Sequence, residues 1–206
     1  AYQDFPYLDD EQEIRRRLDA WRQGKTGIPL IDACMRCVNT TGYLNFRMRA
    51  MLISFLCHQL NIDWRLGSAH LAAQFLDFEP GIHYPQFQMQ AGVTGINAIR
   101  LYNPLKQAKE RDPESSFISK WLPELSSLPA EVRGTVNELS DMEQTMHGFD
   151  IKQHYYEAVI DLNVSTHDAR DRLWAFQKQP SVRAANIEVL KRHTIPDRAR
   201  MLNMHS

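Results

Sequence analysis

The longest run of apolar positions in the chain covers residues 50–60 and predicts a helix that is buried on most of its faces. The run contains neither glycine nor proline, and it lacks the strict alternation of a strand. Arg47 and Arg49 directly precede it, and an unpaired buried charge is very costly. We therefore expect acidic partners, for which Asp77 and Glu79 are the candidates. The four residues predict either a binding site or a structural ion-pair network at helix ends.

Helical periodicity, bounded by caps and stops, accounts for most of the remaining chain. Asp9 or Asp10 is suited to cap a helix that Gly24 ends, and Pro29 suits the first turn of a second helix that Gly42 ends. Further helices are expected over residues 68–76, 105–110, 115–125, 154–161, 166–178 and 180–193, with short helices over 126–150. No repeat and no convincing alternating strand is found. The predicted fold is therefore all-α.

Two segments stand outside this helical pattern. Residues 77–103 are rich in glycine, proline, glutamine and aromatic residues but poor in charge, and they predict a long loop. A loop of this length inside a compact domain is usually functional or disordered, and its aromatic content argues against disorder. We expect it to pack around another group, although an aromatic-rich segment of this kind is also compatible with plain core. The basic tail, residues 194–206, is expected to fray.

Composition narrows the class of protein without giving a function. The 206 residues are 43% apolar and 24% charged, as in ordinary globular proteins. No apolar run approaches the roughly 18–20 residues that a membrane span requires, and the N-terminus lacks the layout of a secretory signal. Three cysteines indicate a reducing compartment, so the expected location is cytoplasmic. Because the net charge is −1, any nucleic-acid contact requires a local basic patch.

Two short motifs resemble catalytic or binding motifs but lack their context. Cys34 and Cys37 form a C-x-x-C, but no second pair exists and Cys57 alone cannot complete a four-cysteine metal site. We interpret them as small apolar residues on one helix face and expect no metal. Lys25-Thr26 stands beside glycines without the spacing of a phosphate-binding loop, so we interpret it as part of a helix stop.

A series of short motifs follows the predicted helices in a fixed order. They are Trp21-x-x-Gly24-Lys25-Thr26-Gly27-x-Pro29-x-x-Asp32-Ala33-x-Met35-Arg36, Thr41-Gly42-Tyr43, Arg47-x-Arg49, Asp63-Trp64-Arg65-x-Gly67, Asp77-x-Glu79, Gly92, Arg100-x-Tyr102-Asn103-Pro104-x-x-Gln107 and Phe117-Ile118-x-x-Trp121-Leu122-Pro123-Glu124-Leu125. No single piece is decisive. Together, over residues 21–125, they resemble the FAD-binding helical domain of DNA photolyases and cryptochromes. The chain resembles the C-terminal half of a bacterial member of this family.

The resemblance implies that FAD is the cofactor. The implied cofactor-binding residues are Arg49, Asp77, Phe78, Glu79, His83 and Asn45. In this family Arg49 would pair with Asp77 close to the isoalloxazine ring, and His83 would face the flavin N5. A cation near the ring favours the anionic reduced flavin from which repair starts.

The resemblance also implies damaged DNA, carrying a UV pyrimidine dimer, as the partner. The implied DNA-binding residues are Arg47, Gln107 and Lys106, and those implied in the chemistry are Trp64, Phe46 and Arg47. A flipped-out dimer would enter a cavity above the flavin. There the reduced, photoexcited flavin would donate an electron, the cyclobutane ring would split, and the electron would return.

This chain departs from the family pattern at three positions. Phe46 stands where an asparagine is common, and His83 stands where asparagine or aspartate is often found. Trp64 matches the middle member of the tryptophan chain used for photoreduction, but the member closest to the flavin falls on Phe87. The aromatic residues that could substitute for it are Tyr84, Tyr43 and Trp21.

A complete family member carries an N-terminal α/β antenna domain, which is absent from this chain. We assign residues 1–125 to the core of the FAD-binding domain and residues 126–206 to a C-terminal helical extension of it. The leading hypothesis is a DNA photolyase that is monomeric when intact. The alternatives are a cryptochrome-like photoreceptor that acts by signalling, and an isolated fragment that binds neither FAD nor DNA. A basic rim of Lys106, Lys109, Arg111, Lys120 and the basic tail would favour repair, and an exposed apolar patch would favour signalling.

Overall fold

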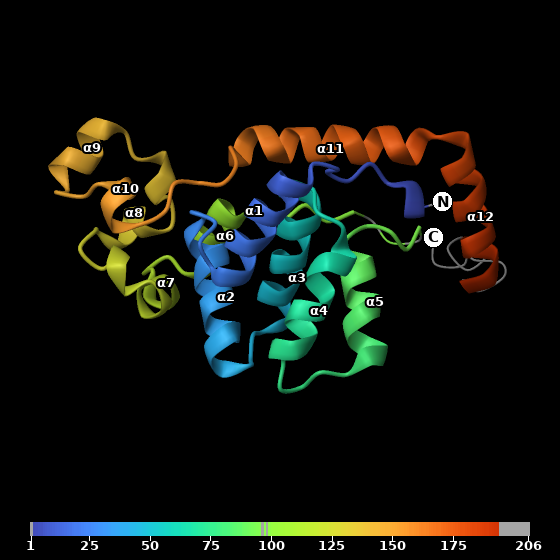
Figure 1. Ribbon diagram of the computed structural model, residues 1–206, viewed down its shortest axis with the longest axis horizontal. Helices are drawn as coiled ribbons and strands as arrows, with labels where there is room; N and C mark the ends of the chain where they lie inside the picture. Colours follow the sequence, from blue (N-terminus) through green and yellow to red (C-terminus); the bar gives the residue numbers. More distant parts are fainter. Residues whose placement is uncertain (1, 96, 98, 194–206) are drawn as a thin grey trace, which may run out of the picture.

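The computed structural model describes residues 2–95, 97 and 99–193, and every regular element in these ranges is helical (Figure 1). The α-helices are α1 Glu11–Gln23, α2 Pro29–Thr41, α3 Phe46–Ser54, α4 Trp64–Gln74, α5 Pro80–Gln90, α6 Pro104–Arg111, α7 Ser116–Trp121, α8 Ala130–Arg133, α9 Asp141–Met146, α10 Ile151–His154, α11 Leu162–Lys178 and α12 Pro180–His193. The predicted all-α fold is confirmed. Among the described helices, none combines the length and the apolar character needed to cross a membrane. The expected frayed tail lies outside the described residues.

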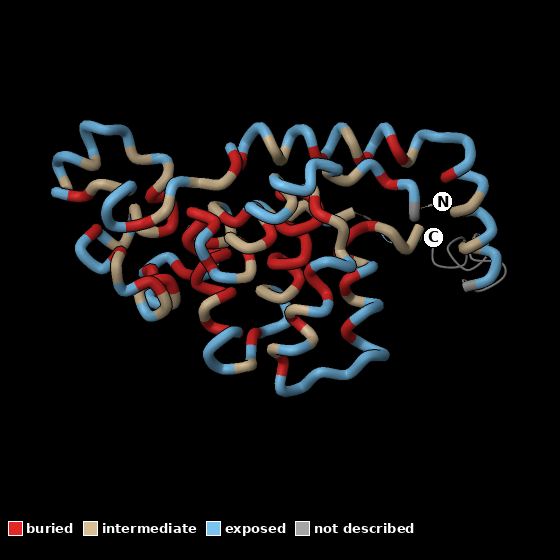
Figure 2. The backbone as a smooth tube through the Cα atoms, viewed as in Figure 1, coloured by how far each residue is buried: buried red, intermediate tan, exposed pale blue. Residues whose placement is uncertain are grey.

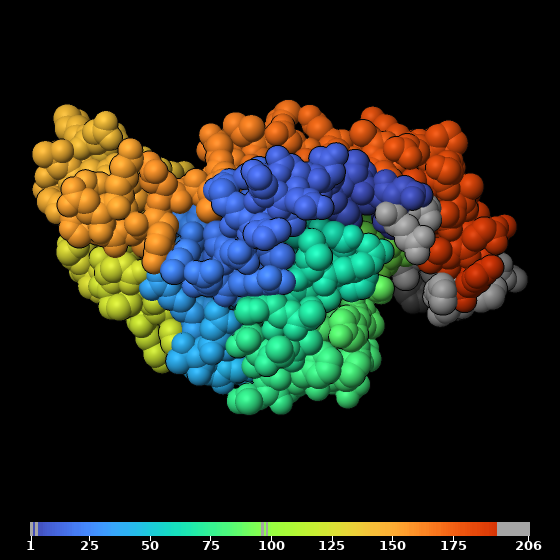
Figure 3. All heavy atoms as spheres, in the orientation of Figure 1, coloured from blue at the N-terminus to red at the C-terminus, as the bar shows by residue number. Residues whose placement is uncertain are grey.

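Helices α1 to α6 form the centre of the molecule (Figure 1). Helices α7 to α10 gather at one end, α11 runs along the centre, and α12 turns away at the other end. The buried positions concentrate in the central helices, whereas α9, α11 and α12 carry mostly exposed or half-buried residues (Figure 2). In the space-filling view α1 and the N-terminal residues lie beside α11 and cover part of the centre (Figure 3).

Local sequence fixes the ends of the first two helices. Asp10 accepts hydrogen bonds from two backbone N–H groups of the first turn of α1, at 2.9 and 3.0 Å, and so caps the helix. Gly24 and Gly42 follow α1 and α2 with φ of 63° and 69°, a conformation that favours glycine. Pro29 is the first residue of α2, where a missing N–H costs little. The predicted boundaries are confirmed.

The predicted buried helix over residues 50–60 is confirmed, but its second half is not α-helical. Helix α3 continues directly into a π-helical segment, Phe55–Gln59. The His58 ring nitrogen Nε2 lies 2.9 Å from the Gln90 carbonyl oxygen, and Gln59 Nε2 donates to the Tyr102 carbonyl at 2.7 Å. These bonds fasten the chain that follows α5 to the buried helix, and π-helical turns of this kind are frequent near functional sites.

The predicted loop over residues 77–103 is wrong in its first half, because residues 80–90 form α5. Glu79 caps this helix by accepting a hydrogen bond from the Gly81 N–H at 3.0 Å, and Pro80 occupies its first position. Pro85 lies inside the helix and has no N–H to donate, which normally destabilises a helix. Because α5 packs against both α3 and α4, tertiary contacts override the local preference of its glycine and prolines.

Three smaller expectations also differ from the structure. Helix α4 begins before residue 68 because Asp63 caps it, accepting from the Arg65 N–H at 2.9 Å. Helix α11 begins before residue 166 because Asp161 caps it in the same way. The helix expected over 154–161 is wrong, because α10 ends at His154 and the residues that follow are not helical. Their backbone instead docks on the centre.

A buried carboxylate, Asp32, holds this docked segment. It accepts hydrogen bonds from the Thr26 N–H at 2.7 Å, the Thr26 hydroxyl at 2.6 Å, the Gly27 N–H at 2.9 Å and the Tyr155 hydroxyl at 2.5 Å. Burial raises the pKa of Asp32 to about 6. A Cβ atom on Gly27 would lie 2.6 Å from the Glu157 carbonyl oxygen, so only glycine fits there. The loop between α1 and α2 is therefore an internal docking element.

Candidate functional site

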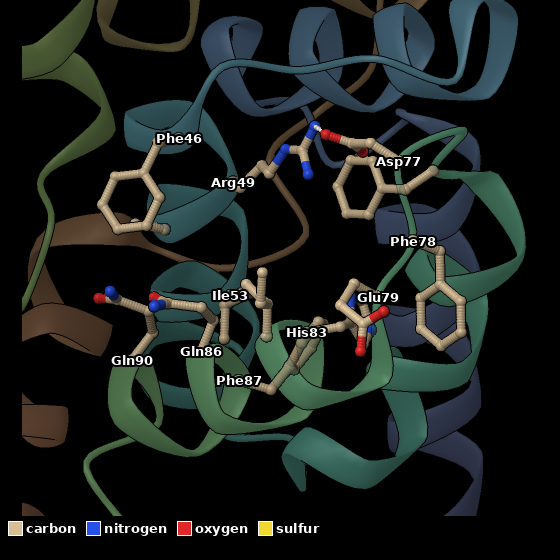
Figure 4. A pocket seen from close by; sticks show the side chains of 13 residues that line it. Phe46, Arg49, Ile53, Asp77, Phe78, Glu79, His83, Gln86, Phe87 and Gln90 are labelled. Atoms are coloured by element: carbon tan, nitrogen blue, oxygen red, sulfur yellow. Dashed lines mark hydrogen bonds and ion pairs between the residues drawn. The ribbon is translucent and has the colours of Figure 1, made fainter.

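A hollow of about 520 Å³ opens between α3, α5 and the loop that joins α4 to α5. This volume includes the solvent-filled mouth of the hollow. Figure 4 shows Phe46 and Arg49 of α3 across an open centre from Gln86, Phe87 and Gln90 of α5, with Ile53 of α3 beside the α5 side chains. They are Phe46, Arg49, Ala50, Ile53, Phe75, Asp77, Phe78, Glu79, Ile82, His83, Gln86, Phe87 and Gln90. We call this cavity the first hollow.

Helical spacing explains which side chains reach the first hollow. Phe46, Arg49, Ala50 and Ile53 of α3 recur at intervals of three and four residues and so share one face. The α5 residues that line the opposite wall follow the same rule: Ile82, His83, Gln86, Phe87 and Gln90. The site is therefore built by two packed helices, which hold side chains more precisely than a long loop would.

Arg49 is held by three different contacts at the edge of the first hollow. Its Nε donates to the Leu44 carbonyl at 2.5 Å, and its Nη2 lies 3.0 and 2.9 Å from the two carboxylate oxygens of Asp77. The guanidinium carbon lies 3.9 Å from the centroid of the Phe75 ring, a cation–π contact. Among the described residues none bonds Arg49 Nη1, so this nitrogen can donate to a ligand. The predicted pairing of Arg49 with Asp77 is observed.

The other expected pair is not formed. Arg47 is exposed, and Glu79 uses its carboxylate to cap α5. The physical reason is helical geometry, because two residues of separation on α3 turn Arg47 and Arg49 about 200° apart. The sequence predicted a buried ion pair, but the Asp77 side chain is 56% exposed, so the pair lies at the surface. The hydrogen bond from Arg49 nevertheless lowers the pKa of Asp77.

His83 lies at the centre of an aromatic cluster in the first hollow. Its ring centroid is 4.9 Å from that of Phe87 and 5.2 Å from those of Phe78 and Tyr84. His83 Nε2 lies 2.9 Å from the Ser68 carbonyl oxygen, and since a carbonyl only accepts, this nitrogen carries the proton. Burial lowers the pKa of His83 and favours the neutral ring. Its Nδ1 therefore remains an acceptor.

Two buried polar atoms of the first hollow have no hydrogen-bond partner within the described ranges. They are Gln86 Oε1 and Gln90 Nε2. Leaving such an atom unsatisfied costs roughly 1–3 kcal/mol, so each is better explained by a bound ligand. These atoms, the free nitrogen of Arg49 and the aromatic walls suit a flat ring system that carries both donors and acceptors. The isoalloxazine ring of FAD has this character, and the residues present fit it.

The structure divides the predicted site residues between two hollows. Asn45, Arg47 and Gln107 line a second hollow of about 560 Å³, together with Leu30, Met48, Met51 and Arg111. Asn45 therefore lies apart from the other predicted cofactor-binding residues, and it caps α3 by accepting from the Met48 N–H at 3.0 Å. Lys106 lines neither hollow, and its Nζ lies 3.7 Å from a carboxylate oxygen of Glu110.

The predicted catalytic residues occupy different surroundings. Phe46 lies on the rim of the first hollow and is 59% exposed, whereas Phe87 is buried in its wall. Trp64 is the first residue of α4, packs against the main core, and lines neither hollow. The Arg65 guanidinium lies 5.3 Å from the Trp64 ring centroid. A role of Trp64 in electron transfer stays a prediction.

The cysteines occupy apolar surroundings. Cys34, Cys37 and Cys57 are buried and form no disulfide, and burial raises the thiol pKa values of Cys34 and Cys57. Across the described part of the chain, no group of three or more His, Cys, Asp or Glu side chains is placed to hold a metal ion. These positions are consistent with the interpretation of Cys34 and Cys37 as small apolar residues in the core.

Sequence reasoning missed the residues of the first hollow that lie on the second half of α5. Gln86 and Gln90 were not predicted as site residues because residues of a loop share no helix face, and this segment was predicted to be a loop. The signal was present as a helical spacing from Ile82 through Gln86 to Gln90. Pro80, Gly81 and Pro85 concealed it, because these residue types normally mark turns.

The fold and the first hollow define a helical cofactor-binding domain. A family model described as the FAD binding domain of DNA photolyase matches residues 1–175. The chain belongs to this family, whose cofactor is FAD.

Similar sequences carry two kinds of name. A cryptochrome DASH from Natronomonas pharaonis is 36% identical over 154 residues, which cover 75% of this chain and 32% of the relative. A deoxyribodipyrimidine photo-lyase from Escherichia coli is 41% identical over 118 residues, which cover 56% of this chain and 25% of the relative. The chain thus matches a third or less of the length of these relatives.

Solved structures show the same architecture. A Synechocystis cryptochrome superposes with a TM-score of 0.74 at 32% identity, over 82% of this chain and 34% of that protein. A bacterial class III photolyase from Agrobacterium tumefaciens superposes with a TM-score of 0.76 at 26% identity, over 86% of this chain and 36% of that protein. The predicted resemblance to the photolyase and cryptochrome helical domain is confirmed at the level of fold.

Proposed function

We propose that this chain is the FAD-binding catalytic part of a DNA photolyase, which uses light to repair UV pyrimidine dimers in DNA. The observation that carries the proposal is the construction of the first hollow. A fixed guanidinium stands at its edge, aromatic rings line it, and unsatisfied amide atoms remain in its wall. Most of the residues predicted to bind the cofactor meet there, in a chain of the FAD-binding family.

The residues of the first hollow have distinct roles in this proposal. When bound, reduced FAD supplies the electron that light transfers to the dimer. Arg49 places a fixed positive charge beside the ring and so favours an anionic cofactor. His83, held neutral by burial, keeps Nδ1 as an acceptor. Phe87 and Ile53 are buried and exclude water from the inner wall.

The activity belongs to a longer protein of the kind that the relatives represent, because this chain spans about a third of their length. We propose that residues 1–125 form the core of the domain and that residues 126–206 extend it. In support, the main buried cluster also contains Leu128, Val136, Phe149 and Ile160. The C-terminal position in the protein, an antenna domain outside this chain, a bacterial source, a cytoplasmic location and a monomeric state are further proposals from the resemblance.

The first test is an absorbance spectrum of the purified chain after FAD is added and the excess removed. A structured visible flavin band in stoichiometric amount is the expected result, since the first hollow already holds its side chains in place. A colourless protein would contradict cofactor binding by these residues alone and would favour the third hypothesis, a fragment that binds neither FAD nor DNA.

The second test separates repair from signalling. A cryptochrome-like photoreceptor is the rival function, because relatives named cryptochrome DASH match a large part of the chain and apolar Phe46 stands on the rim of the first hollow. Light-driven loss of thymine dimers from a synthetic oligonucleotide, measured with the FAD-loaded intact protein, is expected for a photolyase. Flavin photochemistry without repair would favour the photoreceptor.

A further inference from the structure

A third hollow lies between α11 and the segment that follows α5. Its volume is about 1050 Å³, including the solvent-filled mouth. Side chains of α11 line one wall, and described residues between positions 95 and 101 line the other. The third hollow shares no lining residue with the first or the second hollow. It is therefore a separate cavity, and neither the cofactor nor the implied DNA contacts account for it.

Both walls of the third hollow are fixed by packing. Leu173 of α11 belongs to a buried cluster that is separate from the main core, and Ile99 and Leu101 of the opposite wall pack against this cluster. Gly95, also on that wall, has a φ of 76°, and a Cβ atom there would lie 2.6 Å from Asn186 Oδ1 of α12. Only glycine allows this close approach of the backbone to α12. The hollow thus has an apolar floor that is formed before any ligand binds.

One face of α11 points its side chains at the third hollow. Arg170, Leu173, Trp174 and Gln177 recur at intervals of three and four residues and so share this face. The Trp174 side chain is 60% exposed. No aromatic ring and no cation of the described residues stacks on it, in contrast to Trp64, which lies beside Arg65. A flat indole face therefore remains open to a ligand inside a cavity.

Arg170 is not used by the fold. It is exposed, and its side chain has no ion pair and no hydrogen bond with any described residue. By contrast, Arg172 on the same helix donates to the His58 carbonyl at 2.9 Å. The side-chain amide of Gln177 is likewise without a partner in the described part of the chain, and none of the described lining residues is acidic. A forked guanidinium beside an amide, with no carboxylate near, suits a phosphate group.

The spacing of these groups selects the ligand. Residues four apart on a helix have Cβ atoms roughly 5–6 Å apart, so the Arg170 guanidinium and the Trp174 ring lie side by side. In a nucleotide the base and the phosphate are separated by one ribose, a distance that two such side chains can span. Stacking on an aromatic ring accepts any base, because every base has a π-face. A nucleotide therefore satisfies the ring, the cation and the amide together.

We propose that the third hollow binds a free nucleotide, with its base stacked on Trp174 and its phosphate held by Arg170. This site goes beyond the proposed function, because it uses no residue of the cofactor site. A nucleotide within a single strand supplies the same chemistry. The free nucleotide is favoured because one aromatic ring and one guanidinium are found among the described lining residues, whereas a groove for a strand repeats both along its path.

The experiment is calorimetric titration of the FAD-loaded chain with adenosine monophosphate (AMP), with adenosine and with a short single-stranded oligoadenylate. AMP is expected to bind at least tenfold more tightly than adenosine, because only AMP reaches Arg170. Trp174→Leu should weaken both ligands about tenfold, and Trp174→Phe should restore most of the loss. Arg170→Gln should lower the affinity for AMP to that for adenosine and leave adenosine unchanged.

Lys178→Gln is the matched control. It removes a positive charge from an exposed position of α11 that does not line the third hollow, and it should leave all three affinities unchanged. The expected pattern, with FAD content and melting temperature unchanged in every variant, supports the proposal.

The other outcomes overturn the proposed site. Absence of any heat of binding with millimolar AMP removes it, while FAD content in the same samples tests the proposed function separately. Equal losses in Arg170→Gln and Lys178→Gln would show general charge attraction instead of a phosphate contact. Binding of AMP to the FAD-free chain alone would assign the signal to the adenylate half of the cofactor site. An oligoadenylate that binds far more tightly than AMP would make a strand the occupant, and the free nucleotide would be wrong.

Discussion

Arg47 and Arg49 lie two residues apart on α3, yet they line different hollows and are held in different ways. Arg49 is held by a carbonyl oxygen, a carboxylate and an aromatic ring, so its position is set before any ligand binds. Arg47 is exposed and has no such contacts among the described residues. Ordering it on binding therefore costs side-chain entropy, roughly 1.5–2 kcal/mol. A preorganised cation suits a retained cofactor, whereas Arg47 is not held in place by the fold before a ligand binds.

The largest expected effect is the loss of FAD when Arg49 is replaced. Arg49→Ala removes the donors beside the ring, and hydrogen bonds to a charged group contribute roughly 1.5–3 kcal/mol. We expect FAD affinity to fall at least tenfold, measured by fluorescence titration of the FAD-free chain. The cause is the lost guanidinium rather than a stranded charge, since the Asp77 side chain is 56% exposed.

Arg65→Ala is the matched control for this comparison. Arg65 also forms a short ion pair, with Asp63 at 2.6 Å, but it lines neither hollow. Its replacement should leave FAD affinity within twofold of the unchanged chain. Equal FAD affinities of the Arg49→Ala and Arg65→Ala variants would remove the first hollow as the cofactor site.

The second expected effect is a pH dependence of stability that arises from a residue supporting the first hollow. The His58 ring bonds the backbone carbonyl of Gln90, a residue that lines the first hollow. His58 is not among the residues that line the second hollow. Burial lowers its pKa to about 4, from an ordinary value of 6.5. Unfolding therefore takes up a proton between these values. The free energy of unfolding should fall as the pH falls from 6.5 towards 4, with a contribution of roughly 2 kcal/mol at pH 5.

Urea unfolding at pH 5 and pH 7.5 measures this contribution. The comparison must be made with His58→Gln, because the raised pKa of Asp32 acts in the opposite direction between about pH 4 and 6. The glutamine can still donate to the Gln90 carbonyl but does not titrate. The variant should lose less stability on acidification than the unchanged chain. Identical changes in both proteins would show that His58 is not buried in the neutral form.

The smallest effect tests the unsatisfied amides. Gln90→Met keeps the shape of the side chain but removes Nε2, which is buried without a partner. We expect the free energy of unfolding of the FAD-free chain to rise by about 1 kcal/mol, while FAD affinity falls several-fold. Gln107→Met makes the same change in the second hollow and should lower DNA affinity instead of FAD affinity. A gain of FAD affinity in Gln90→Met would contradict the assigned contact.

Helix ends were predictable where the determining interaction is local. Asp10, Gly24, Pro29 and Gly42 act within one turn of their own helix, through a cap, a left-handed conformation or a fixed φ. Helix α5 was not predictable in this way. Its local residues favour turns, and only packing against α3 and α4 stabilises it. Residues 155–161 show the opposite case. Their pattern is mildly helical, but tertiary contacts, including the bond from Tyr155 to Asp32, hold them in a non-helical conformation.

The sequence by itself determined the all-α class, the family and the pairing of Arg49 with Asp77, because these follow from periodicity and from motifs that persist in the chain. Only the tertiary structure decided which hollow each residue serves. It placed Arg47 and Asn45 with Gln107 and Arg111, and it left Lys106 outside. Spacing along a helix gives the face of a residue, but the partner of that face depends on how the helices pack.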